Sequence, residues 1–201
     1  RTRGHTRSLS VSWARSVYKR QDNDNILAAR EAVNHLYKLG HRKIGYVGTD
    51  LKRIFSADRK AGYMLALAEN NVPFQENYYL EMPQVPKNKT NRLLRFLSRE
   101  DRPTAVLVSD DILAMVLEKT AFELHLQIPE DLSIISFNNS LFSKLSSPQL
   151  TSIDINSRQL GIEAASQMIN HIENPGLLAT KIIVPHFMIE RQSCAPPKAP
   201  R

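Results

Sequence analysis

Apolar and polar positions along this chain follow two rhythms that alternate from one end to the other. Short runs of apolar residues, typical of buried strands, are separated by stretches in which apolar residues recur every three or four positions, typical of amphipathic helices. Because the two kinds of element alternate, we expect an α/β fold, a doubly wound and mostly parallel sheet. The pattern predicts strands at 43–48, 78–81, 104–108, 132–137, 151–155 and 181–185, helices at 26–40, 56–71, 90–99, 111–125 and 157–173, and a loop at 141–150.

Polar residues follow two of the predicted strands and mark the first place to look for a site. One strand ends in Ser109, Asp110 and Asp111, and the next is followed by Asn138. In doubly wound sheets, ligands bind beyond the carboxyl ends of the strands. We expect Asp111 to cap the following helix through its side-chain oxygen, and we expect Asp110 and Asn138 to point into a cleft.

Two more side chains can join this site, Arg59 and Phe55. Arg59 is expected in the first turn of its helix, where the helix dipole disfavours a cation unless an anionic or hydrogen-bonding group offsets it; a solvated surface arginine is the alternative. With Asp110 and Asn138 it would supply donors and acceptors suited to vicinal hydroxyls. Phe55 could cover the apolar face of a sugar ring. These residues favour a ligand-binding site.

Other chemistries find little support in the sequence. There is no G-x-G-x-x-G, Walker or G-x-S-x-G motif, and the histidines have no metal-ligand spacing. The adjacent acids Asp110 and Asp111 could suggest acid–base catalysis, but neighbouring residues at a strand end diverge and one is expected to cap a helix. We therefore expect no catalytic residues, no metal and no cofactor.

The positive charge is concentrated at the N-terminus. The net charge is +7, and residues 1–21 carry six basic residues and no acid, which leaves +1 for the rest. A disordered basic arm, or a nucleic-acid or targeting tail, would explain this. We favour a third interpretation: 11–21 reads as a translated sequencing adapter, so 1–21 is a non-native, disordered segment. The natural N-terminus would then lie outside this chain.

Five motifs, in order, resemble the effector-binding core of the LacI/GalR family of bacterial repressors. The resemblance covers 22–194, and within the family 22–29 and 137–145 are similar to the maltose-operon repressor branch. The motifs are Leu-Gly-His-Arg-Lys-Ile-Gly-Tyr-Val-Gly (39–48), Ala-Asp-Arg-Lys-Ala-Gly-Tyr (57–63), Pro-Thr-Ala-Val-Leu-Val-Ser-Asp-Asp (103–111), Ile-Pro-Glu-Asp-Leu-Ser-Ile-Ile-Ser-Phe-Asn-Asn (128–139) and Ser-Pro-Gln-Leu-Thr-Ser-Ile (147–153).

The resemblance implies a periplasmic-binding-protein-like (type I) fold whose two lobes close on an effector. It places 22–155 and 177–194 in the C-terminal lobe, 156–176 as a helix of an otherwise missing N-terminal lobe, and 195–201 in a tail. The helix-turn-helix domain would be absent, and the apolar stripe of the helix at 157–173 would be exposed.

The resemblance also assigns residues. Arg59 aligns with the effector-binding arginine of the family, Asp110 with a position held by Asn or Asp, and Asn138 with a position usually held by Asp. In the family, an Arg-Gln-Pro sequence that makes a contact between the lobes is more common at the position of Asp154-Ile-Asn, so we do not carry that contact over to this chain. A homodimer interface is implied at Ile112, Met115, Val116, Lys119, Leu141, Phe142 and Leu145, with ordinary core packing as the alternative.

The function implied is that of a sugar-responsive transcriptional repressor, with maltose or a related sugar as effector. Operator DNA would bind through the missing N-terminal domain, and the protein would be cytoplasmic with no membrane partner. The alternative is the sugar-binding protein of an extracytoplasmic transport system, which shares the fold. A glycoside hydrolase that uses Asp110 and Asp111 is a distant third.

Overall fold

The computed structural model describes residues 21–50, 53–82, 89–178 and 180–198, and the chain divides into two compact units. Among the described residues, one unit comprises those up to residue 24 and those within 155–186, and the other comprises those within 25–154 and from 187 onward. Residues 1–20, to which most of the predicted adapter segment belongs, lie outside the described residues.

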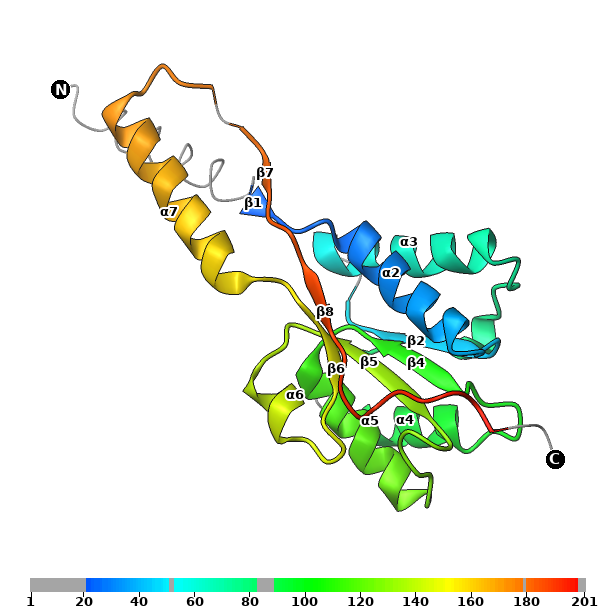
Figure 1. Ribbon diagram of the computed structural model, residues 1–201. Coiled ribbons are helices and arrows are strands. Elements are labelled where there is room, and N and C mark those ends of the chain that lie inside the picture. The colour runs from blue at the N-terminus through cyan, green and yellow to red at the C-terminus, as the bar shows by residue number, and fades with distance from the viewer. Residues whose placement is uncertain (1–20, 51–52, 83–88, 179, 199–201) are drawn as a thin grey trace. The chain divides into compact units, whose positions relative to one another are not determined.

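The larger unit is built on a six-stranded sheet (Figure 1). Five adjacent strands are parallel, and β8 runs antiparallel to β6 at one edge, so the predicted α/β fold with a mostly parallel sheet is confirmed. In spatial order the strands are β3 (Tyr79–Glu81), β2 (Ile44–Gly48), β4 (Ala105–Val108), β5 (Ser133–Phe137), β6 (Thr151–Asp154) and β8 (Phe187–Ile189).

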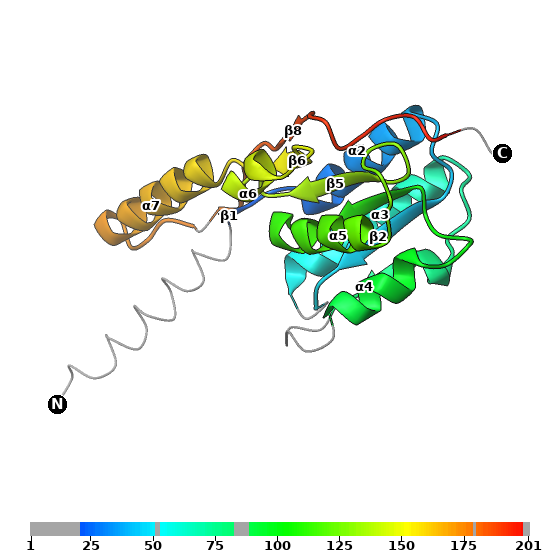
Figure 2. The same ribbon diagram turned by 90° about the horizontal axis from the view of Figure 1, so that it is seen from below.

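Helices cover both faces of this sheet, as Figures 1 and 2 show. On one face lie α2 (Asn25–Lys38) and α3 (Ile54–Glu69), and on the other lie α4 (Lys89–Leu97) and α5 (Asp111–Glu123). A short 3-10 helix (Glu76–Tyr78) precedes β3. The prediction of a continuous loop at 141–150 was wrong, because α6 (Leu141–Leu145) forms there beside α5.

The core of the larger unit lies against the sheet. Every residue of β2, β4 and β5 is buried, which explains why these strands are uninterrupted small and apolar runs in the sequence. Between the sheet and the α4–α5 layer, Val106, Leu113, Leu117 and Ile134 are at most 4% exposed. Full burial of one such side chain stabilises a fold by about 1.5–3 kcal/mol.

Gly62 sets the close approach of α2 and α3. A Cβ atom at this position would clash with the carbonyl oxygen of Ile26 and would lie 2.9 Å from the Cβ atom of Ala29. The two helix backbones therefore meet where the sequence has no side chain. This contact fixes α3, and with it the position of Arg59.

The smaller unit contains β1 (Gln21–Asp22), α7 (Ser157–Glu173) and β7 (Ile182–Ile183), with β1 and β7 paired in parallel. The buried Asn23 donates through Nδ2 to the carbonyl oxygens of Ile155 (2.9 Å) and Val184 (2.8 Å). This side chain, which directly follows β1, thereby links that strand to Val184, which follows β7, and to Ile155, which lies before α7.

Helix α7 presents apolar side chains to solvent. Ile169 and Ile172 of the predicted stripe are exposed, whereas Leu160 and Met168 are half-buried. The segment 177–186, predicted with the larger part of the chain, lies in the same unit as α7. Membership of these units in the lobes of a longer protein stays a prediction. No helix among the described residues is long and apolar enough to cross a membrane.

Candidate functional site

The carboxyl ends of β2, β4 and β5 meet at one edge of the sheet, because these strands are adjacent and parallel. The edge is held in register by backbone hydrogen bonds, from Ser109 N to Val47 O (2.9 Å) and from Asn138 N to Ile153 O (2.8 Å). The polar residues that follow the strands are therefore brought together, as the sequence pattern predicts.

Arg59 lies at this edge, but not where its helix was expected to begin. Helix α3 starts at Ile54, so Arg59 is in the second turn and not in the first. The prediction started the helix at 56, because it followed only the apolar positions that face the core. Ile54 and Phe55 are helical as well. The dipole argument for an unusual first-turn cation therefore does not apply to Arg59.

The Arg59 side chain is 5% exposed and joins three segments. Its Nε donates to Oδ1 of Asn25 at the start of α2 (2.9 Å), and its Nη1 donates to the carbonyl oxygen of Ser109 at the end of β4 (2.5 Å). Its guanidinium carbon lies 3.9 Å from the ring centroid of Phe137 at the end of β5. A buried charge needs such partners to offset its lost hydration.

Phe55 lies on the same side of α3 as Arg59. The Arg59 guanidinium carbon is 5.1 Å from the Phe55 ring centroid, within the range of a cation–π contact. The Phe55 side chain is half-buried, so part of its ring remains open to solvent. Arg59 and Phe55, both predicted site residues, are therefore brought together, beside the backbone of Ser109.

The helix cap is provided by the other of the two adjacent acids than the sequence predicted. Asp110, not Asp111, is the N-cap of α5: its Oδ1 accepts a hydrogen bond from Leu113 N (2.8 Å). Its side chain is half-buried at the sheet edge, and its Oδ2 lies 3.4 Å from the hydroxyl of Ser109. The prediction that Asp111 caps the helix was wrong.

Asp111 instead turns into the protein, where it is 1% exposed. Its Oδ1 accepts hydrogen bonds from the hydroxyls of Ser136 on β5 (2.5 Å) and Ser152 on β6 (2.9 Å). Its Oδ2 accepts from the backbone N–H of Ser140 (2.7 Å). One carboxylate thus fixes the start of α5, two strands and the turn after β5. The serines inside two buried strands were the sequence signal for this network.

Asn138 begins a turn with unusual backbone geometry. Its φ is 99° and that of Asn139 is 45°, and asparagine is one of the few residues other than glycine that tolerate positive φ. Asn138 is half-buried and directly follows Phe137, the last residue of β5, whose ring contacts the Arg59 guanidinium group. It therefore stands at the predicted edge.

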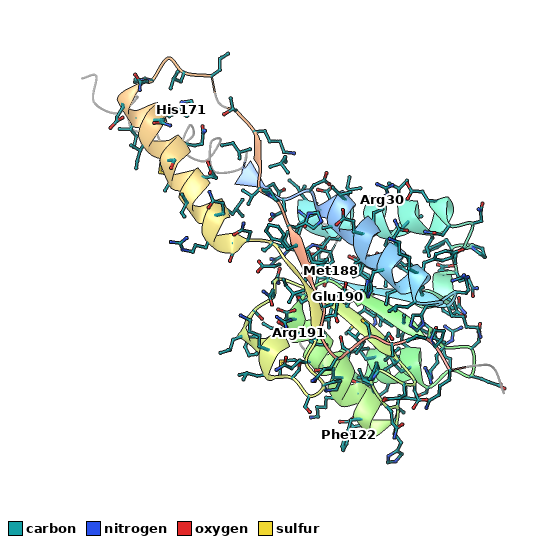
Figure 3. All side chains as sticks on the ribbon, in the orientation of Figure 1. Arg30, Phe122, His171, Met188, Glu190 and Arg191 are labelled. Carbon is teal, nitrogen blue, oxygen red and sulfur yellow. The ribbon has the colours of Figure 1, made fainter. Side chains whose placement is uncertain are left out.

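A network around Arg191 was missed by the sequence analysis. Nη2 of Arg191 donates to Oδ1 of Asn139 (2.5 Å), and Nδ2 of Asn139 donates to Oδ2 of Asp154 (2.8 Å). Nη1 of Arg191 donates to the carbonyl oxygen of Leu150 (2.6 Å). Figure 3 shows Arg191 on the C-terminal segment that runs beside β6. Its partners are about 40 to 50 residues away along the chain, and no local pattern links them.

The residues predicted for a dimer interface lie on α5 and α6, and we call them the α5–α6 face. Four large apolar members are well exposed: Ile112 (61%), Leu141 (65%), Phe142 (46%) and Leu145 (71%). Met115 and Lys119 are exposed too, whereas Val116 is half-buried and packs against the core. Core packing therefore accounts for Val116 and not for the other six residues.

The described residues contain no group of three or more His, Cys, Asp or Glu side chains arranged to hold a metal ion. Buried His41 lies at the opposite edge of the sheet and contacts Thr104 (2.9 Å), Ser133 (3.1 Å) and the Ala195 carbonyl oxygen (2.9 Å). Burial lowers the pKa of His41. These contacts give this histidine a structural role.

Comparison with known proteins gives consistent matches. Residues 33–194 match the model of the periplasmic binding protein-like domain family. The HTH-type transcriptional repressor PurR of Klebsiella pneumoniae is 33% identical over 164 residues, which are 82% of this chain and 48% of the repressor. The chain thus spans about half the length of the curated relatives it matches.

Solved structures agree with this match. A LacI transcriptional regulator from Bacillus cereus subsp. cytotoxis superposes with a TM-score of 0.83 at 33% identity, covering 88% of this chain and 62% of that one. The transcription regulator CcpA of Lactococcus lactis gives a TM-score of 0.78 at 28% identity, covering 87% and 64%. The periplasmic-binding-protein-like fold is confirmed, and the relatives are regulators and not enzymes, as predicted.

Proposed function

The chain belongs to the periplasmic binding protein-like domain family and corresponds to the effector-binding core of LacI-family transcriptional regulators, and from this premise we propose that it is part of a sugar-responsive transcriptional repressor. In the complete protein, a DNA-reading domain outside this chain binds operator DNA. The effector binds one arrangement of the protein better than another and so shifts the equilibrium between them. The complete protein acts in the cytoplasm, where its operator is.

The effector site we propose is the sheet edge around Arg59. One observation supports it most: the end of β4, the end of β5 and the Phe55 ring all contact the same buried guanidinium group, that of Arg59. A guanidinium offers hydrogen-bond donors in a planar fork, and an aromatic ring beside it suits the apolar face of a sugar. Asp110 and Asn138 stand at the same edge and would accept or donate to ring hydroxyls.

We propose maltose, or a related glucose oligomer, as the effector, because 22–29 and 137–145 resemble the maltose-operon branch. Asn138 stands where most of the family has Asp, so this position supplies an amide in place of a carboxylate. An amide both donates and accepts, which changes the hydroxyl pattern that the site prefers.

We propose that the α5–α6 face joins two copies into a homodimer. Five of its seven members are apolar and exposed, and they gather on two neighbouring helices, as is typical of an interaction surface. In an interface made by the same face of both copies, these side chains would be buried on each copy.

Isothermal titration of the complete protein with maltose tests the effector site. The variant Arg59→Ala should bind maltose about 1–3 kcal/mol more weakly, because a charged donor is lost from the ligand site. Arg30→Ala is the matched control, since Arg30 forms an exposed ion pair with Glu69 (2.8 Å) on the outer side of α2 and α3. Its maltose affinity should not change.

Two results would count against this site. Equal maltose affinity in wild type and Arg59→Ala would remove Arg59 from it. Saturable binding of a purine base, a flat ring that could also stack on Phe55, without any binding of maltose would make the sugar assignment wrong. Arg59→Lys, which keeps the charge, separates loss of ligand contacts from loss of the fold, provided that its melting temperature stays close to that of wild type.

A further inference from the structure

A pocket lies near the C-terminal end of α5, whereas Asp110 caps the N-terminal end of the same helix. It has a volume of about 360 Å³, within the range of small-ligand pockets. Helix α5, the turn that follows it and the turn after α6 all contribute walls. Among the lining residues are Glu118, Phe122, Ile128, Glu130, Ser147 and Pro148.

Glu118 is the unusual group in this pocket. Its Oε1 atom is buried and, among the residues that the structure describes, has no hydrogen-bond partner. Burial away from water raises the pKa of Glu118 to about 7, from an ordinary value near 4.5. A buried carboxylate oxygen without a donor is costly for a protein, and such a group is expected to have a partner when the protein acts.

The rest of the lining fits a cation on an apolar arm. Glu130 adds a second carboxyl group at the rim, so the pocket is acidic in a chain with a net charge of +7. Phe122 is 81% exposed and projects outward from α5 (Figure 3), offering a ring face to a cation. Ile128 and Pro148 supply apolar wall.

We infer that this pocket, the Glu118 pocket, binds an ammonium or guanidinium group carried on an apolar arm. The cation would donate to Glu118 Oε1 and lie against the Phe122 ring, and its arm would cover the apolar wall. The group can belong to a free amine or to a lysine or arginine side chain of a second copy of this chain. The inference does not depend on the sugar site.

The first experiment titrates the 201-residue chain with agmatine, which carries a guanidinium and an ammonium group on a four-carbon arm. Saturable binding is expected, and Glu118→Gln should weaken it by about tenfold or more, since tenfold corresponds to the loss of one charge-assisted hydrogen bond. Glu123→Gln is the control. Glu123 lies on the same helix, contacts Lys119 (4.0 Å) and does not line the pocket. Removing its carboxylate should therefore leave agmatine affinity within about twofold of wild type.

The second experiment distinguishes the source of the cation. Sedimentation equilibrium measures self-association of wild type, Glu118→Gln and Glu123→Gln. If a second copy supplies the cation, Glu118→Gln weakens association by about tenfold while Glu123→Gln does not. The inference is overturned if Glu118→Gln binds agmatine as tightly as wild type. It is also overturned if agmatine does not bind and Glu118→Gln leaves self-association unchanged.

Discussion

Two adjacent aspartates have opposite tasks, and the difference can be measured. Asp110 is half-buried and accepts a hydrogen bond from Leu113 N and a long one from the Ser109 hydroxyl, whereas Asp111 accepts three in the interior. Loss of a helix cap costs about 1 kcal/mol. Loss of Asp111 leaves two buried hydroxyls and a backbone N–H without an acceptor, which costs about 3 kcal/mol or more.

We therefore predict that Asp111→Ala lowers the free energy of unfolding by at least twice as much as Asp110→Ala. Urea denaturation of the two variants, followed by circular dichroism, measures both values. A larger loss in Asp110→Ala would show that the Asp111 network contributes little to stability.

The sequence could indicate that polar residues stand at this edge but not which acid does what. Both aspartates directly follow the strand, and either could reach the helix N–H groups. The choice depends on Ser136 and Ser152, which are 25 and 41 residues further along the chain. Arg59 was placed correctly at the edge, yet its contact with Phe137 depends on strand order, which periodicity does not give.

At the scale of elements, two helical glycines should respond oppositely to the same substitution. Gly62 lies where α3 meets the backbone of α2, whereas nothing lies within 4 Å of a Cβ atom built on Gly161 in α7. Gly62→Ala should destabilise the protein by about 1–3 kcal/mol through overpacking. Gly161→Ala should stabilise α7 by about 0.5–1 kcal/mol through helix propensity.

The melting temperatures of Gly62→Ala and Gly161→Ala test these two predictions. Melting temperatures that shift in the same direction would contradict the close approach of α2 and α3 at Gly62. Because Gly62→Ala forces the helices apart, it should also disturb Arg59, which bonds Asn25 at the start of α2.

Buried His41, at the amino ends of the strands, should make the stability of the protein depend on pH. Burial lowers the pKa of His41 below its ordinary value of 6.5, so the folded protein keeps the ring neutral while the unfolded chain takes up a proton. Stability should therefore fall as the pH decreases through 6.5, because the unfolded state then binds more protons.

Urea denaturation between pH 8 and pH 5 in wild type and His41→Gln tests this. The variant should be less stable at pH 8 and should lose less stability on acidification. An identical pH profile in both proteins would mean that His41 is not the responsible group.

Most elements were predictable because buried strands and amphipathic helices leave clear periodicities, as β4 and α5 illustrate. Helix α6 was missed because five residues are too short for a helical period. Strand β8 was missed for another reason. It is an edge strand with exposed Phe187, and its antiparallel pairing with β6 is long-range.

At the scale of the whole molecule, the α5–α6 face predicts how the protein assembles. Leu145→Asp should weaken dimerisation by about tenfold or more, because it removes an apolar contact and would bury an unpaired charge. Ile54→Asp is the matched control: Ile54 is 73% exposed on α3, and an acid is tolerated in a first helical turn.

Sedimentation equilibrium of both variants gives the dissociation constants. Dimerisation lost only in Leu145→Asp would support the α5–α6 face. Equal effects of the two substitutions, or a Leu145→Asp dimer as tight as wild type, would contradict it.

The central claim is that a ligand at the Arg59 site controls DNA binding by the complete protein. The most direct measurement is the operator affinity of wild type and Arg59→Ala, each with and without saturating maltose, by fluorescence anisotropy. We predict equal affinities without maltose, a change of about tenfold or more in wild type when maltose is added, and a much smaller change in the variant. Operator affinity of wild type that maltose leaves unchanged, or an equal response in Arg59→Ala, would contradict the account.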